Sequence, residues 1–317
     1  MKKKIFAIVL AVALLLSLAC CGAPKEKAVV NAAVLKGPTG MSAAWLMEEN
    51  EKGSSLNSYN FTVAGAADEI TAGLVSGSVD IAAVPTNLAS VLYNKTEGGI
   101  CMLAVNTLGV LYILEKGESI KSVKDLEGKK IVSAGQGTTA QYVTDYILEK
   151  NGVKAQIDYV SEHAEAASLA LSGKYDVVAL PEPFVTSVTS KDASFKKALD
   201  LTEEWEKLGE GELVMGAVAA RKDFVENNPD AVKAFMEEYE KSVAFTNESI
   251  TEAASLCGKF DIVAKEVAEK AIPDSHIVFM TGQEMSEKIM QFLNVIYSAD
   301  PSSVGGALPG DGFCYGL

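Results

Sequence analysis

Residues 76–90 read SGSVDIAAVPTNLAS, and residues 172–186 read SGKYDVVALPEPFVT. The second stretch begins 96 positions after the first, and this offset holds without a gap from Glu69/Glu165 to Leu92/Val188. Six of the 24 aligned pairs are identical, and most of the others exchange one apolar residue for another. Self-similarity at a fixed offset indicates repeated structural units, so we expect two similar lobes.

Each copy of the repeat alternates strand-like and helix-like segments. In the first copy, the helical pattern of residues 67–77 precedes the buried-strand pattern DIAAV at 80–84. In the second copy, DVVAL at 176–180 takes the same place. Short apolar runs between helices are typical of parallel strands buried on both faces. The alternation predicts right-handed βαβ units in each lobe.

Two long strand-like segments, residues 100–117 and 212–221, follow the first and second copies. We expect them to cross between the lobes and form a hinge. The predicted fold class is therefore α/β, with two similar lobes of mostly parallel sheet joined by a two-strand hinge. The predicted division gives 31–110 plus 218–317 to lobe 1 and 111–217 to lobe 2. The helical C-terminal remainder is expected to pack on lobe 1.

The N-terminus has the features of an export signal. Three lysines precede an apolar run of 14 residues at 5–18, which is shorter than the roughly 20 residues that a membrane span needs. The ending LSLACCG resembles a bacterial lipobox. We expect a signal peptide at 1–19, lipid on Cys20, and a polar tether at 20–30 that holds the protein on the extracytoplasmic side of the cell membrane. Lipid on Cys21, or an unlipidated secreted chain, remain alternatives.

The charge of the chain excludes some partners. Lys and Arg number 28 and Asp and Glu number 42, so without its three leader lysines the exported chain carries a formal charge of −17. An acidic protein repels nucleic acid and anionic membrane surfaces. Arg221 is the single arginine, and we expect it in a surface ion pair. An anionic ligand would then be held without the bidentate guanidinium that usually binds such groups.

No catalytic, metal or cofactor motif stands out. The chain has no CxxC pair, no Cys/His cluster, no GxSxG, no HExxH and no phosphate loop. His163 and His276 are isolated, and neither is expected in a cleft loop. We therefore expect no catalytic residue, no metal, no cofactor and no enzymatic activity.

Ligands of open parallel sheets bind beyond the carboxyl ends of the strands, where helices begin. In this chain those ends carry glycines, hydroxyls and amides, which suit a small polar molecule. Asn106 ends the first crossing strand, and Glu182 and Phe184 follow the second DVVAL-type strand. The predicted ligand-binding residues are Gly37, Pro38, Thr39, Gly40, Met41, Thr86, Asn87, Asn106, Gln136, Gly137, Thr138, Thr139, Glu182 and Phe184.

The lipobox, the two lobes, the GPTGM and GQGTT loops and LPEPF together resemble bacterial ABC-transporter substrate-binding lipoproteins. The resemblance covers roughly residues 31–315 and implies the type 2 periplasmic-binding-protein fold, nearest to its nitrate, sulfonate, taurine and thiamine-precursor class. It implies capture of a solute by lobe closure and delivery to membrane permease subunits. The protein is expected to be a monomer.

The ligand class follows from energetics. A micromolar ligand needs about 8 kcal/mol, and a helix start contributes up to about 2 kcal/mol to an anion. Apolar contact must supply much of the rest, which favours a small organic solute, sulfonate-like or thiamine-precursor-like, over nitrate. Lys36 is a possible cationic contact. The alternatives are an enzyme on the same fold, of the pyrimidine-precursor or dehydratase type, and a ligand sensor.

Overall fold

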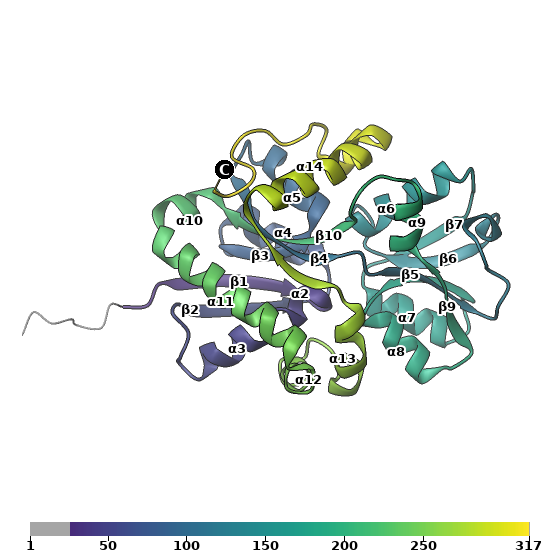
Figure 1. Cartoon of the computed structure of the whole chain (residues 1–317), viewed down its shortest axis with the longest axis horizontal. Coiled ribbons are helices and arrows are strands. Elements are labelled where there is room, and N and C mark those ends of the chain that lie inside the picture. The colour runs from purple at the N-terminus through teal and green to yellow at the C-terminus, as the bar shows by residue number, and fades with distance from the viewer. Residues whose placement is uncertain (1–25, 317) are drawn as a thin grey trace, which may run out of the picture.

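The structure is a computed structural model that describes residues 26–316. The predicted signal peptide, 1–19, and the predicted lipidation site, Cys20, lie outside the described residues. Two β-sheets, each flanked by helices, form two lobes side by side (Figure 1). The α/β class and the two-lobed fold are as the sequence predicts.

Lobe 1 contains a six-stranded sheet in the order β11-β4-β10-β3-β1-β2. Its strands and helices come from both ends of the chain. They are β1 (Val29–Leu35), α2 (Pro38–Met41), α3 (Ala44–Glu51), β2 (Ser58–Ala64), α4 (Ala67–Ser76), β3 (Ile81–Pro85), α5 (Thr86–Lys95), β4 (Ile100–Leu108), β10 (Val214–Arg221), α10 (Lys222–Asn227), α11 (Pro229–Glu248), α12 (Ile250–Lys259), α13 (Lys265–Ala271), η2 (Ile272–Asp274), β11 (Ile277–Met280), α14 (Gly282–Ala299) and η3 (Pro301–Val304).

Lobe 2 contains a five-stranded sheet in the order β7-β6-β8-β5-β9. Its elements are continuous in the chain. They are β5 (Leu111–Lys116), η1 (Val123–Leu126), β6 (Lys130–Ala134), α6 (Thr139–Lys150), β7 (Gln156–Val160), α7 (His163–Leu171), β8 (Val177–Pro181), α8 (Phe184–Lys191), β9 (Phe195–Asp200) and α9 (Leu201–Lys207).

The sequence repeat is a repeat of structure. The parallel trio β2-β1-β3 of lobe 1 has the same order as the trio β7-β6-β8 of lobe 2. The shared Ser-Gly pair ends the equivalent helices α4 and α7. Gly77 has φ 82° and Gly173 has φ 76°, a left-handed conformation that glycine adopts without strain at a helix C-terminus.

Both sheets are mixed, so the expectation of mostly parallel sheets is wrong in detail. Strand β10 runs antiparallel to both β3 and β4 in lobe 1, and β5 runs antiparallel to both β8 and β9 in lobe 2. The physical reason is the crossing itself. A strand that enters from the other lobe starts beside the carboxyl ends of the parallel strands, as Gly216 does beside Pro85 and Leu111 beside Pro181, and therefore runs in the opposite direction.

Two crossings connect the lobes. Residues 109–110 join β4 to β5, and residues 208–213 join α9 to β10. The long segment 100–117 is therefore two strands, one in each sheet. Strand β10 pairs with β4 from Val214 onward, so residues 214–217, given to lobe 2 from the sequence, lie in the lobe 1 sheet. The full division into lobes stays a prediction.

Helices α10 to α12 lie with lobe 1, α13 also contacts α8 of lobe 2, and α14 contacts both lobes. It packs on β4 and β10 of lobe 1 and on α6 of lobe 2. Its yellow ribbon runs along the top of lobe 1 in Figure 1, above α5. The C-terminal helices pack on lobe 1 as expected, but α13 and α14 also contact lobe 2, and α14 buries apolar residues of both lobes in one continuous cluster.

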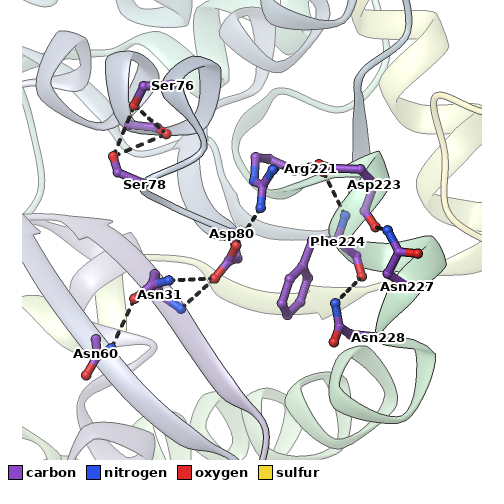
Figure 2. A network of polar contacts seen from close by, with 11 residues as sticks. Asn31, Asn60, Ser76, Ser78, Asp80, Arg221, Asp223, Phe224, Asn227 and Asn228 are labelled. Atoms are coloured by element: carbon purple, nitrogen blue, oxygen red, sulfur yellow. Dashed lines mark hydrogen bonds and ion pairs between the residues drawn. The ribbon is translucent and has the colours of Figure 1, made fainter.

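Arg221 forms ion pairs at the end of the lobe 1 sheet opposite to the carboxyl ends of β1 and β3. Its Nη2 lies 2.8 Å from Asp80 Oδ1 and its Nη1 lies 2.7 Å from Asp223 Oδ2. The other oxygen of Asp80 accepts bonds from the backbone N–H and the side-chain amide of Asn31, both at 2.9 Å. Figure 2 shows this network, which ties β10 to the starts of β1 and β3. Arg221 forms ion pairs, as expected, but one of its two partners, Asp80, is buried and not on the surface.

Within residues 26–316, no helix combines the length and the apolar character needed to cross a bilayer. The same residues contain no group of His, Cys, Asp and Glu arranged to hold a metal ion. Cys101, Cys257 and Cys314 are buried and carry free thiols.

Candidate functional site

A cavity of about 530 Å³ lies between the two lobes. Its walls come from the carboxyl ends of parallel strands in both sheets, including Leu35 and Pro85 of lobe 1 and Pro181 of lobe 2. Val110, between β4 and β5, and Met215, at the start of β10, also line it. This size and position are typical of small-molecule sites in proteins with open sheets.

Six of the predicted ligand-binding residues line this cavity, and they come from both lobes. They are Pro38, Thr39, Gln136, Gly137, Thr138 and Thr139. The last four belong to the loop after β6 and the first turn of α6. Contact of these six with a ligand stays a prediction.

The other eight predicted residues do not line the cavity, and the structure gives a reason for each. Gly37 forms the turn before α2 with φ 131°, which suits glycine alone. Gly40 is packed so closely that a Cβ would lie 2.5 Å from the carbonyl oxygen of Leu35. Met41 is 0% exposed in the lobe 1 core.

Thr86 and Asn87 begin α5 but point into the flank where the lobes meet, and both are 0% exposed. Asn106 is also buried. Its side-chain amide donates a hydrogen bond of 2.9 Å to the hydroxyl of Tyr239. It adjoins two residues of the cavity wall, Gly216 and Thr107, and the hydroxyl of Thr107 donates to Asn106 Oδ1 at 3.2 Å.

Glu182 and Phe184 turn away from the cavity. Glu182 is 0% exposed, its Oε2 accepts a bond of 3.0 Å from the N–H of Thr186, and its Oε1 lies 3.1 Å from Lys197 Nζ. Phe184 packs behind His163, with ring centroids 5.4 Å apart. A strand-end position fixes where a residue sits but not which side of the strand its side chain takes.

Tyr159 and His163 line the cavity although the sequence did not single them out as ligand residues. They lie at the end of β7 and the start of α7. The expectation that no histidine occupies a cleft loop is therefore wrong. The position of His163 one residue after the β7–α7 loop, in a strand–helix unit, is the signal that could have indicated it.

Two polar atoms of this pair have no hydrogen-bond partner among the described residues. They are the hydroxyl of Tyr159 and Nδ1 of His163, and both atoms are inaccessible to solvent. Burial lowers the pKa of His163 to about 4, so the imidazole is neutral at pH 7. Burial, together with the charge of Asp145, raises the pKa of Tyr159 above its usual range. Both groups are therefore neutral and bring no charge to the cavity wall.

The charged groups of the cavity wall are Lys36 and Asp68. Lys36 Nζ lies 2.8 Å from Asp261 Oδ2, whose side chain is 94% exposed. An exposed ion pair of this kind contributes only about 0–1 kcal/mol, so a bound anion can recruit Lys36 at little cost. The first turns of α4, α6 and α7 also border the cavity, and their unpaired N–H groups add positive potential.

The lobes also meet at Gly65, which belongs to the cavity wall on lobe 1. The carboxyl group of Glu162, from lobe 2, lies so near that a Cβ on Gly65 would approach it to 2.7 Å. Only glycine leaves this space without displacing Glu162. The cavity therefore combines apolar walls, neutral donors and helix starts, which suit a small, partly apolar molecule with an anionic group.

Comparison with protein families matches residues 56–281 to the family described as menaquinone biosynthesis. The matched range includes most of the cavity wall in both lobes. The chain is also 26% identical over 211 residues to the Bacillus subtilis (strain 168) protein named "Putative aliphatic sulfonates-binding protein". This match spans 66% of the chain and 59% of the length of that relative.

Solved structures share the fold over most of the chain. The crystal structure of an ABC transporter from Parabacteroides distasonis has a TM-score of 0.75 and 25% identity, over 91% of this chain and 99% of that one. The alkanesulfonate-binding protein SsuA from Xanthomonas axonopodis pv. citri, bound to MOPS, has a TM-score of 0.72 and 14% identity, over 90% and 96%. SsuA from Escherichia coli has a TM-score of 0.70 and 17% identity, over 90% and 91%.

Proposed function

The chain belongs to the menaquinone biosynthesis family, and from its two-lobed architecture we propose that it captures a small organic solute by lobe closure, as the extracytoplasmic binding component of an ABC importer. The observation that carries the proposal is the cavity between the lobes, to which both sheets contribute residues at strand ends. The Parabacteroides relative, an ABC transporter, supports the same reading.

The proposed ligand is an organic anion of the sulfonate class with an apolar part. The cavity wall supports it in two ways. Three helix starts and Lys36 supply positive potential for the anionic group, and Leu35, Pro85 and Leu88 supply apolar contact. The Bacillus subtilis relative is named a putative aliphatic sulfonates-binding protein, and the alkanesulfonate-binding protein SsuA from Xanthomonas is bound to MOPS in its structure. A thiamine-precursor pyrimidine is the second ligand of this proposal, because its ring would use the unpaired donors Tyr159 and His163.

Calorimetric titration tests the proposal with ethanesulfonate, taurine, MOPS and the hydroxymethylpyrimidine thiamine precursor, with nitrate and sulfate as bare anions. We expect micromolar binding of at least one organic compound and much weaker binding of the bare anions. Failure of every organic compound to bind or to raise the melting temperature would rule out the proposed ligand classes.

A matched pair of variants tests whether the ligand binds at the cavity wall. Thr138→Val removes a cavity-wall hydroxyl that donates to the carbonyl of Gly135 at 2.6 Å. Thr144→Val removes a hydroxyl of the same helix that donates to the carbonyl of Ala140 at 2.8 Å, away from the cavity wall. We expect the first variant alone to lower affinity, by about fivefold to tenfold for one lost hydrogen bond.

An enzyme is the second candidate function, and two observations favour it. The matched family is described by a biosynthetic pathway, and the cavity wall includes a neutral histidine and a tyrosine whose hydroxyl has no partner among the described residues. Such a pair can exchange protons with a substrate. Mass spectrometry of bound compounds after incubation decides between the two functions, since an importer component returns its ligand unchanged.

The proposal includes export and anchoring. Lipid on Cys20 would hold the protein at the outer side of the cell membrane beside its permease subunits, as a monomer. Labelling cells with radioactive palmitate tests this arrangement. We expect label in the wild type, no label in Cys20→Ser, and release of that variant from the membrane fraction; unchanged labelling would move the site to Cys21.

A further inference from the structure

Asn87 joins three segments that are distant in the chain. It is the second residue of α5 in lobe 1 and is 0% exposed. Its side-chain amide donates to the carbonyl of Gly137 at 3.0 Å and to the carbonyl of Ser303 at 2.9 Å. Its Oδ1 accepts the hydroxyl of Thr139 at 3.1 Å, and its backbone N–H donates back to that hydroxyl at 3.3 Å. Three of the four bonds cross from lobe 1 to lobe 2.

We propose that Asn87 is an interlobe latch that holds the start of α6 against lobe 1 in the closed protein. This inference rests on the proposed function, because it names the residue that stabilises lobe closure. Asn87 is a positioning residue. It acts on the cavity through Gly137 and Thr139, which line the cavity wall.

The C-terminal segment orients the side chain of Asn87. The carbonyl of Ser303 in η3 occupies one amide hydrogen of Asn87, so the other hydrogen and Oδ1 are aimed at lobe 2. The surroundings are dry, since the hydroxyls of Thr86 and Ser303 are inaccessible to solvent and have no partner among the described residues. A desolvated site makes each interlobe bond harder to replace by water than an exposed one.

Asn94 provides a matched control on the same helix. Its amide donates to the carbonyls of Val304 at 2.8 Å and Ala307 at 2.6 Å, so it anchors the same C-terminal segment. Both bonds end on the C-terminal segment and reach no residue of lobe 2. Asn94→Ala therefore measures the effect on lobe closure of loosening the C-terminal segment. Asn87→Ala measures that effect together with the loss of the interlobe side-chain bonds.

The test measures the distance between the lobes in the full chain without ligand. Spin labels are placed at Glu69→Cys in α4 and Glu165→Cys in α7, which are equivalent and exposed positions of the two repeats. Double electron–electron resonance then gives the populations of short and long distances. Of the five native cysteines, the three within the described residues are buried, and a parallel sample without the two substitutions measures any labelling of native cysteines.

We expect the wild type to show a short-distance population without ligand. Asn87→Ala lowers the closed-to-open ratio about tenfold, Asn94→Ala leaves it unchanged, and Thr139→Val lowers it nearly as much as Asn87→Ala. Adding Thr139→Val to Asn87→Ala then lowers the ratio by less than Thr139→Val does alone, because the two substitutions share the bond between the Thr139 hydroxyl and Asn87 Oδ1. Urea unfolding of each variant separates loss of folding from loss of closure.

A long distance alone in the wild type, or equal effects of Asn87→Ala and Asn94→Ala, would overturn the latch. These outcomes are independent of the calorimetric panel, since lobe closure is measured without a ligand. Absence of sulfonate or pyrimidine binding with an intact latch would reject the proposed ligands and leave the latch in place.

Discussion

The indole of Trp205 in lobe 2 packs against the ring of Phe292 in α14, with centroids 5.7 Å apart. Trp205 also packs on Tyr146 of α6 at 5.2 Å, and it is 0% exposed. Since α14 otherwise lies on lobe 1, this contact gives the two lobes a shared apolar core beside the crossing strands. Helix α14 therefore supports the two crossings between the lobes.

Phe292→Ala tests the shared core. Deleting a fully buried aromatic ring costs about 3–5 kcal/mol of the free energy of unfolding, and the cavity here would open between the lobes. Phe292→Leu keeps most of the volume and should cost less than about 1.5 kcal/mol. Urea unfolding followed by circular dichroism measures both values. In a Trp45→Phe background, Phe292→Ala should also shift the emission of Trp205 to longer wavelength; an unshifted emission and a loss below 1 kcal/mol would contradict the shared core.

The two carboxylates that pair with Arg221 should differ in their contribution to stability. The side chain of Asp80 is 7% exposed and that of Asp223 is 64% exposed. Asp80→Ala leaves Arg221 and the amide of Asn31 without their buried partner, so we expect a loss of about 3 kcal/mol. Asp223→Ala should cost less than about 1 kcal/mol. Denaturant unfolding compares the two variants, and equal losses would show that the network in Figure 2 does not depend on burial.

A second ion-pair group lies where α13 and η2 of lobe 1 approach lobe 2. Lys197 Nζ lies 3.1 Å from the buried Glu182 and 3.0 Å from Asp274 of η2. Burial lowers the pKa of Lys197, but the bond to Asp274 and the charge of Glu182 outweigh burial and raise it above its ordinary value. Lys197 therefore stays charged at neutral pH.

Lys197→Met leaves the carboxylate of Glu182 buried without its cation, and we expect a loss of about 3 kcal/mol in the free energy of unfolding. Asp274→Asn removes an exposed partner, with 55% of its side chain accessible, and should cost less than about 1 kcal/mol. Glu182→Gln should restore part of the stability of Lys197→Met. A double variant that is no more stable than Lys197→Met would refute the assignment of the loss to the unpaired carboxylate.

His163 should make stability depend on pH in one window. Burial holds its pKa near 4 in the folded protein, below the ordinary value of 6.5. As pH falls from 6.5 to 4, the unfolded chain binds a proton that the folded protein does not, so acid favours unfolding in this window. A shift of this size corresponds to at most about 3 kcal/mol, and partial exposure of the ring reduces it.

His163→Gln should remove this part of the pH dependence, while His276→Gln should leave it. Urea unfolding at pH 7 and pH 4.5 gives the difference for each protein. Equal pH dependence in wild type and His163→Gln would show that the imidazole titrates at its ordinary pKa. With two histidines in the chain, the ring proton signals in an NMR titration assign the pKa directly.

The sequence predicted the repeated architecture better than the residues that line the cavity. The offset of 96 residues predicted the matching trios of strands, and residues of the loops after β1 and β6, which the sequence analysis gave to a ligand site, line the cavity. Asn87 and Glu182 occupy equally plausible strand-end positions, yet both turn into contacts with other elements. Their partners, Ser303 and Lys197, are 216 and 15 residues away in the chain, and a local pattern gives no information on them.

The amino-acid sequence by itself determined the two repeated lobes and their strand–helix alternation, because buried strands and amphipathic helices follow from the periodicity of apolar residues. Only the tertiary structure decided that α14 serves both lobes, that Tyr159 and His163 face the cavity, and that Asn87 bonds across the lobes. Those relations depend on how the two sheets are placed relative to each other. That placement is set by close packing among residues far apart in the chain.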